Sequence, residues 1–284
     1  MHTRLSAAGG CDAMEHLTPQ RRPAPGAHVH AAEARGDSVA LVIPAYDEEA
    51  NLPRLFRQIE EAFRRTGVTG PVIIVDDGSC DATASLVRNY RGPLRLDLVR
   101  HRANLGLGRA LRTGLRRAIA YPKVEWVVTL EGDTTSDLGA LGRILRAAQE
   151  GADVVQASNH HPRGTLLGAP LLRRLSSRSV SQLMRLASGL DLHTFTNLYR
   201  CIRADLLASA FARHGDGLVS SAGFSGVTEL LIRLGRGGAR VVEVPVVLDA
   251  GRRSGESNMR VIPTTFGHLR IAAHAAHARV VAAR

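Results

Sequence analysis

Acidic residues follow two of the apolar runs in this sequence. Glu131-Gly132-Asp133 comes directly after residues 126–130, and Asp76-Asp77 comes directly after residues 72–75. Two carboxylates on either side of one small residue can both turn toward a single hard cation such as Mg²⁺ or Mn²⁺. A carboxylate at a strand end can also accept hydrogen bonds from a nucleobase or a ribose hydroxyl. The spacing therefore predicts a divalent-cation site at Glu131 and Asp133 that leaves room for the phosphates of a substrate.

The same residues have a plainer interpretation, an acidic turn before a helix that is capped by Thr134, Thr135 or Ser136. The position of both acidic pairs at strand ends favours the cation site. Gly106-Leu107-Gly108 opens a predicted helix, but Leu111 occupies the third glycine position of a dinucleotide fingerprint, so tight helix packing is favoured there. The sequence has no GxxxxGK[ST] and no GxSxG motif, which excludes a P-loop nucleotidase and a hydrolase with a nucleophile elbow.

Short apolar runs alternate with stretches of helical periodicity, which predicts βαβ units and a mainly parallel sheet. We therefore predict an α/β protein with a Rossmann-like, mainly parallel sheet flanked by helices. In such sheets ligands lie at the carboxyl ends of the strands, where the acidic pairs are found. Strands are predicted at 39–43, 72–75, 94–99, 126–130, from 153 and at 240–246, and helices at 52–63, from about 81, at 105–120, up to about 150, at 171–190, at 225–234 and from about 263.

The charge of the chain is consistent with an anionic partner, and the excess of arginine over lysine also partly reflects biased codon usage. Lys and Arg number 37 against 26 Asp and Glu, which gives a net charge of +11, and Lys123 is the only lysine. The arginines are scattered and aromatic residues make up only 4% of the chain, so a stacking platform for nucleic acid is not predicted. Phosphate-bearing small ligands or an anionic membrane surface fit the charge better. No run of about 18 apolar residues occurs, so no membrane-spanning helix is predicted.

The two ends of the chain differ from the middle. Residues 1–37 hold glycines, prolines and four histidines without hydrophobic periodicity, which predicts a disordered tail, and they contain no apolar segment of a secretory signal. The three cysteines are widely spaced without a CxxC pair, and the cytoplasm is the simplest setting for the chain. Residues 263–284 form a predicted helix in which apolar residues such as Phe266 and Leu269 stand beside Arg270, Arg279 and Arg284. This helix either lies on a membrane surface or packs on the domain's own core.

Several of these segments together resemble a known family. Residues 42–52 and 74–83 resemble the opening motifs of family-2 glycosyltransferases, and Asn104–Gly108 and Glu131–Asp133 follow at the expected places. Residues 191–200, 242–245 and 255–257 narrow the resemblance to the polyprenyl-phosphate (dolichol-phosphate) mannosyltransferase-like branch. The resemblance covers about residues 39–260.

The resemblance implies a GT-A fold that binds a nucleotide-sugar and Mg²⁺ or Mn²⁺. It implies a domain at 38–262, with a nucleotide-sugar-binding half at 38–160 and an acceptor-side half at 161–262. Asp133, with Glu131 nearby, would bind the metal and the diphosphate, and Asp133 is the main catalytic candidate. The base and ribose would be held by Pro44, Tyr46, Glu48, Asp76 and Asp77, and the phosphates of donor or lipid acceptor would be engaged by Arg173, Ser177 and Arg252.

The chain departs from the family pattern at several positions. Glu131-Gly132-Asp133 stands for the usual Asp-x-Asp, and residues 194–197 replace a Ser-Gly-Phe segment. Thr135 replaces a glutamine, Asn159 an arginine and Asn258 a lysine.

The expected activity is an inverting, metal-dependent transfer of a hexose from a nucleoside-diphosphate sugar to an acceptor. The acceptor is expected to be a polyprenyl phosphate at the cytoplasmic face of the membrane. A phosphate monoester is mostly ionised at neutral pH and needs no strong base. Two alternatives stay open. A hydroxyl acceptor on a glycan or small metabolite would need a base, for which Glu229 is the candidate, with a role on its helix face as the other interpretation. A non-catalytic nucleotide-sugar-binding protein is the second alternative.

Overall fold

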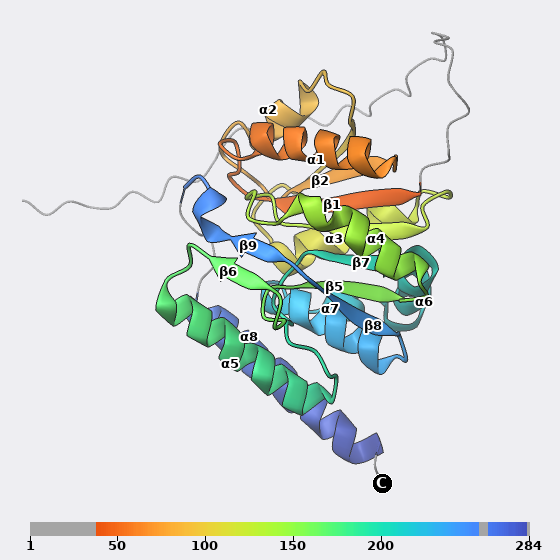
Figure 1. Cartoon of the computed structure of the whole chain (residues 1–284), viewed down its shortest axis with the longest axis vertical. Helices are drawn as coiled ribbons and strands as arrows, with labels where there is room; N and C mark the ends of the chain where they lie inside the picture. Colours follow the sequence, from red (N-terminus) through yellow and green to blue (C-terminus); the bar gives the residue numbers. More distant parts are fainter. Residues whose placement is uncertain (1–37, 256–260, 283–284) are drawn as a thin grey trace, which may run out of the picture. The chain divides into compact units, whose positions relative to one another are not determined.

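A seven-stranded sheet forms the centre of the protein (Figure 1). The computed structural model describes residues 38–255 and 261–282. The strands run in the order β3-β2-β1-β4-β7-β5-β8, and all neighbours are parallel except that β7 is antiparallel to β4 and β5. The predicted mainly parallel α/β sheet is therefore confirmed. The strands are β1 (Val39–Ala45), β2 (Pro71–Asp76), β3 (Arg95–Arg100), β4 (Trp126–Thr129), β5 (Val154–Ser158), β7 (Arg200–Arg203) and β8 (Val241–Pro245).

Strand β1 is apolar along its whole length because helices cover both faces of the sheet. In β1, Ala40 and Val42 point into one hydrophobic cluster, while Leu41 and Ile43 point into the other. This alternation follows from the two-residue period of a strand. All seven residues of β1 are buried.

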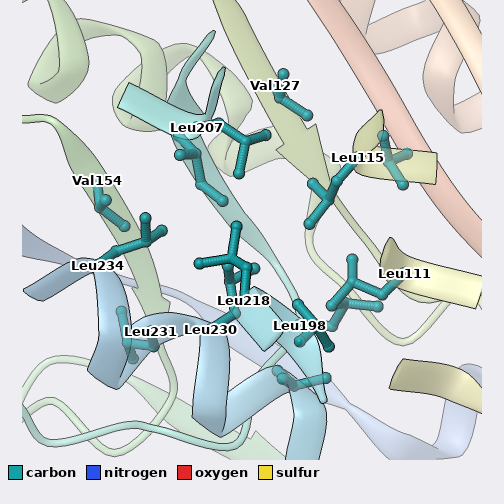
Figure 2. Packing of buried hydrophobic residues seen from close by; sticks show 14 of the residues in the cluster. Leu111, Leu115, Val127, Val154, Leu198, Leu207, Leu218, Leu230, Leu231 and Leu234 are labelled. Atoms are coloured by element: carbon teal, nitrogen blue, oxygen red, sulfur yellow. The ribbon is translucent and has the colours of Figure 1, made fainter. Parts of the chain in front are cut away.

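Different helices supply the two clusters. The first cluster, part of which Figure 2 shows, takes residues from α3 (Leu107–Ile119), α6 (Ala204–His214) and α7 (Ser225–Arg236). Leu111 and Leu115 of α3 and Leu230 and Leu234 of α7 belong to this cluster, and Leu218 lies between the two sets (Figure 2). The second cluster takes residues from α1 (Leu52–Thr66), α2 (Thr83–Arg88) and α4 (Leu141–Gln149). Short 3₁₀ turns lie at Leu138–Ala140, Gly215–Val219 and Ala250–Arg252.

Two long helices, α5 (Leu171–Ser188) and α8 (Val261–Ala282), pack against each other on the side of the domain away from α1 and α2 (Figure 1). A small parallel sheet of β6 (Thr165–Leu167) and β9 (Val247–Asp249) lies near the start of α5. Several large apolar side chains of this region are exposed: Leu167, Leu171, Leu175, Leu186, Phe266 and Leu269. Within the described ranges, no helix is long and apolar enough to cross a bilayer.

The structure adds elements that the sequence pattern did not predict. These are β6, β7, β9 and α6, whereas the helix expected from about residue 263 is α8 (Val261–Ala282). β7 has only four residues, two of which are arginines, so its apolar signal is weak. The predicted tail at 1–37, together with Glu256, Ser257 and Asn258, lies outside the described residues, as do the side chains of Arg279 and Arg284.

Candidate functional site

Two cavities lie at the edge of the sheet where β1, β2 and β4 end. The large cavity, of about 890 Å³, is lined by Pro44, Tyr46, Glu48, Asp77, Glu131 and Asp133 from the predicted set. Residues 104–107, residues 221–225, Arg253 and the start of α8 complete its wall. The acidic pairs therefore meet at one edge, as parallel strands require. Asp76 is the one predicted donor-site residue that does not line this cavity.

Hydrogen bonds between two loops hold Tyr46 and Glu48 at the cavity wall. The backbone N–H of Asp47 donates to Ser79 Oγ at 2.9 Å, and that of Glu48 donates to Thr83 Oγ1 at 2.8 Å. Asp47 adopts a φ of 54°, which a non-glycine residue rarely does and which turns the chain sharply after β1. Burial is the main cause that raises the pKa of Glu48 above its usual range.

The two neighbouring aspartates of the second motif have different surroundings. Asp76 is fully buried, where it accepts from the Ser79 N–H at 2.8 Å and pairs with Arg100 Nε at 2.9 Å. Asp77 accepts from the backbone N–H groups of Leu105 and Gly106 at 3.0 and 2.7 Å, so it holds the loop that forms the opposite wall. Asp76 and Asp77 thus shape the cavity through their hydrogen bonds, and Asp77 also faces it.

The Gly106-Leu107-Gly108 segment serves the tight helix packing that its sequence favours. A Cβ on Gly106, whose φ is 93°, would lie 2.5 Å from Ala222 O. A Cβ on Gly108 would lie 1.9 Å from Ser221 O. Only glycine at these two positions lets α3 approach the 221–223 segment, which is also part of the cavity wall.

Glu131 and Asp133 stand between the two cavities and line both of them. Glu131 accepts from the Leu198 N–H at 3.0 Å and from Ser136 Oγ at 2.7 Å. Asp133 Oδ1 accepts from the N–H and the hydroxyl of Thr135, at 3.1 and 2.7 Å, and Asp133 Oδ2 pairs with Arg253. Thr134, which lies between Asp133 and Thr135 in the chain, has a φ of 63°. This conformation is strained for a β-branched residue, and such strain is typical of functional sites.

Glu131 and Asp133 are the carboxylates at this position that could hold a divalent cation. Asp133 is only 2% exposed, and its Oδ2 pairs with the guanidinium of Arg253. The surroundings of this carboxylate therefore accommodate a positively charged group. Within the described ranges, no group of three or more His, Cys, Asp or Glu side chains surrounds one point. Two carboxylates with the remaining ligands from substrate phosphates and water is the arrangement that Mg²⁺ prefers.

The small cavity, of about 150 Å³, lies beside α5 and carries two predicted phosphate-binding residues. Arg173 and Ser177 line it together with apolar side chains such as Leu166 and Val180. Ser177 Oγ lies 2.9 Å from His160 Nε2 and 3.2 Å from Thr196 Oγ1. Burial, followed by the charge of Arg178, lowers the pKa of His160 to about 4, so its imidazole is neutral at neutral pH.

The neighbouring arginines Arg252 and Arg253 have different positions. Arg252, the predicted phosphate-binding residue, lines neither cavity; its Nε lies 3.4 Å from Asp249 Oδ2. Arg253 lines both cavities and reaches Asp133. The motif pattern predicted Arg252 as the phosphate-binding residue. Which of the two adjacent arginines faces the cavities depends on the course of the backbone, which the sequence does not show. Sequence reasoning also missed Arg270 and Phe266 of α8 in the wall of the large cavity, because a helix pattern does not say what the helix packs on.

Glu229, the candidate base, is buried on α7 and lines neither cavity. Its carboxylate accepts from the N–H groups of Ser220 and Ser221, both at 2.9 Å, and from Ser220 Oγ at 2.6 Å, and it pairs with Arg233 at 2.9 Å. These contacts anchor the 220–221 segment behind the large cavity. They favour the interpretation of Glu229 as a structural carboxylate.

Comparison with known proteins agrees with the geometry. Residues 40–209 match the model of glycosyl transferase family 2. The chain is 29% identical over 225 residues to a polyprenol monophosphomannose synthase of Mycolicibacterium smegmatis, which covers 77% of this chain and 80% of that protein. It is 30% identical over 222 residues to an undecaprenyl-phosphate mannosyltransferase of Micrococcus luteus, with 78% and 87% covered. The resemblance to the polyprenyl-phosphate branch is thereby confirmed.

Solved structures share the fold at low sequence identity. Mannosyl-3-phosphoglycerate synthase from Rubrobacter xylanophilus gives a TM-score of 0.58 at 16% identity and covers 84% of this chain and 74% of its own. Glucosyl-3-phosphoglycerate synthase from Mycobacterium tuberculosis, in complex with Mn²⁺, UDP and phosphoglyceric acid, gives 0.53 at 17%, with 83% and 76% covered. The expected GT-A fold is confirmed. The chain belongs to glycosyl transferase family 2 and is a glycosyltransferase.

Proposed function

We propose that this glycosyltransferase moves a hexose from a nucleoside-diphosphate sugar to a polyprenyl phosphate, with inversion at the sugar carbon and with Mg²⁺ or Mn²⁺ as cofactor. The observation that carries the proposal is the shared wall of the two cavities. Glu131, Asp133 and Arg253 line both of them. The phosphates of a ligand in one cavity would therefore lie close to a ligand in the other.

The large cavity suits the donor. The ring of Tyr46 and the carboxylates of Glu48 and Asp77 offer an apolar surface and acceptors to a nucleoside. Arg253 and Arg270 offer charge to a diphosphate. Glu131 and Asp133 would hold a divalent cation, which would supply Lewis-acid stabilisation of the departing diphosphate.

The small cavity suits a lipid phosphate. Arg173 and Ser177 offer a cation and a hydroxyl to the phosphate, and Leu166, Val180 and Leu248 offer apolar contacts to the first part of a lipid chain. An ionised phosphate oxygen can attack the sugar carbon directly: the new C–O bond forms opposite the diphosphate, whose C–O bond breaks, and the configuration inverts. The relatives named for transfer to polyprenol or undecaprenyl phosphate support this acceptor.

A hydroxyl acceptor is the weaker candidate. It requires a base close to the acceptor. Among the described residues that line the small cavity, the possible bases are Glu131, Asp133 and His268. The proposal assigns the two carboxylates to the metal, and His268 Nε2 lies 3.1 Å from Thr228 Oγ1. Glu229 is held by Ser220, Ser221 and Arg233.

The proposal includes peripheral binding to the cytoplasmic face of a membrane. Leu171 and Leu175 of α5 are 68% and 53% exposed, and Phe266 of α8 is 68% exposed. Arg174 and Arg178 stand on the same exposed face of α5 as these leucines. An apolar strip flanked by arginines is the surface that binds at the boundary of an anionic bilayer.

The test is a transfer assay on the purified full chain with a panel of labelled nucleoside-diphosphate hexoses, Mn²⁺ and undecaprenyl phosphate. We expect label in the lipid phase with one donor, and a rate at least about a hundredfold lower for Asp133→Asn, as for loss of a group that stabilises the transition state. Asp137→Asn removes a carboxylate that caps the turn at Leu138 and should keep most of the rate. Label that moves only to hydroxyl acceptors, or to water, would contradict the proposed acceptor.

A further inference from the structure

The ion pair between Arg253 and Asp133 occupies the carboxylate oxygen that a metal would need. Asp133 Oδ1 is already bonded to Thr135, so Oδ2, the partner of Arg253, is the oxygen left for a cation. The side chains of Asp133 and Arg253 are only 3% and 17% exposed, which makes this a largely desolvated pair at the junction of the two cavities.

The backbone on both sides of Arg253 is fixed to the donor side of the molecule. Ser254 exchanges two hydrogen bonds with the side chain of Asn51, at 2.9 and 3.1 Å. The carbonyl of Arg252 accepts from Thr134 Oγ1 at 3.0 Å. Asn51 also donates to Glu48 at 2.6 Å, so the segment is tied to a residue of the large cavity. Arg253 can therefore change the partner of its guanidinium without moving its backbone.

A divalent cation and a guanidinium compete for Asp133 Oδ2. Two positive groups at one carboxylate repel each other, and the repulsion is strong where water is largely excluded. The repulsion is relieved when a diphosphate enters with the metal. The oxygens of the diphosphate can then accept hydrogen bonds from the guanidinium of Arg253, which leaves the carboxylate of Asp133 for the metal.

We infer that Arg253 is a diphosphate-binding residue that holds Asp133 until the metal and the nucleotide arrive together. In the ligand-free protein it neutralises Asp133 and keeps metal affinity low. When the donor binds, the guanidinium moves from Asp133 to the diphosphate, and the metal and the nucleotide bind cooperatively. The identity of the diphosphate rests on the proposed function. The competition between the metal and Arg253 at Asp133 does not.

The test compares Mn²⁺ binding with and without nucleotide, with free Mn²⁺ measured by electron paramagnetic resonance. Without nucleotide, Arg253→Gln should bind Mn²⁺ about tenfold or more tightly than the parent, because a charge-assisted competitor is gone. At saturating Mn²⁺, the same variant should bind the nucleoside diphosphate of the donor about tenfold or more weakly. Arg253→Lys keeps the charge and should bind free Mn²⁺ less tightly than Arg253→Gln does.

Two controls define the site. Arg252→Gln removes the same charge one residue away, from a side chain that pairs with Asp249, and should leave Mn²⁺ affinity without nucleotide close to that of the parent. Asp133→Asn should abolish the gain in the Arg253→Gln background, which shows that the Mn²⁺ in question is at Asp133.

Equal or weaker Mn²⁺ binding by Arg253→Gln without nucleotide would overturn the competition. Unchanged affinity of that variant for the nucleoside diphosphate would overturn the proposed movement of the guanidinium from Asp133 to the diphosphate. If the parent binds no nucleoside diphosphate at all, the proposed function fails, and the nucleotide-free Mn²⁺ comparison still decides the competition.

Discussion

At the scale of single residues, the aspartates at the strand ends have different partners: Asp76 pairs with Arg100, Asp77 holds the loop at Leu105, and Asp133 pairs with Arg253. The pairs Asp76-Asp77 and Glu131-Gly132-Asp133 were predicted at strand ends, and residues of both pairs line the large cavity. The separate surroundings of Asp76 and Asp77 could not be predicted, because they depend on Arg100 and on the loop at Leu105, which only the fold brings near. The same limit applies to Arg253, which the sequence does not distinguish from Arg252.

His160 gives a pH dependence that belongs to this scale. The imidazole is half-buried beside Ser177, and it faces Arg178, Glu243 and His193. Its pKa of about 4 in the folded protein lies below the ordinary value of 6.5, so protons bind the unfolded chain more readily. The stabilising effect is therefore complete above about pH 6.5 and is lost as the pH falls toward about 4.

We expect His160→Gln to remove this dependence. Between pH 7 and pH 4 the free energy of unfolding of the parent should fall more than that of the variant, by on the order of 2 kcal/mol after allowance for solvent screening. Urea unfolding at a series of pH values measures both curves, and subtraction removes the titration of the carboxylates that the two proteins share. Curves that stay parallel over this range would show that the His160 environment does not resist protonation.

At the scale of elements, six of the seven strands of the central sheet were predicted, including the partly polar β3 and β8, whereas β6, β7 and β9 were not. β1 and β2 are apolar because both faces of the sheet are covered, and that pattern is visible in the sequence. β7 contains Arg200, which is fully buried and donates to the carbonyls of Val227 and Asn197. Val227 lies 27 residues further along the chain, so the burial of this arginine has no local signal in the sequence. The pairing of α5 with α8 is likewise a tertiary contact that the helical periodicity of either segment does not contain.

The α5–α8 pair carries a prediction about membrane binding. The full chain should co-sediment with vesicles that contain phosphatidylglycerol at low salt, and less at high salt. Arg174→Gln with Arg178→Gln should weaken binding about thirtyfold, since each basic residue near an anionic surface contributes about 1 kcal/mol. Arg64→Gln with Arg65→Gln removes the same charge from α1, where both arginines pair with Glu61, and should bind as the parent does. Equal losses in the two double variants would indicate a general charge effect and no membrane face on α5.

At the scale of the whole molecule, one sheet gathers strands from both parts of the sequence. β7 and β8 lie in the same sheet as β1 and β4, so residues from 161–262 stand beside residues from 38–160 at Glu131 and Asp133. The α/β class and the edge that carries the site could be predicted from the order of strands and helices. The division of the site into two cavities could not, because it depends on Phe224, Leu198 and the start of α8, which come from three separate segments.

The central claim is that the large cavity holds the donor and the small cavity the acceptor. The measurement that tests it most directly is the KM for each substrate in Tyr46→Ala and Arg173→Gln, one variant for each cavity. We predict that Arg173→Gln raises the KM for undecaprenyl phosphate about tenfold or more, the cost of a lost charge-assisted hydrogen bond, and leaves the donor KM nearly unchanged. Tyr46→Ala should raise the KM for the donor and leave the KM for undecaprenyl phosphate nearly unchanged. If both variants raise both constants together, or if their effects are exchanged, the assignment of the two cavities is contradicted.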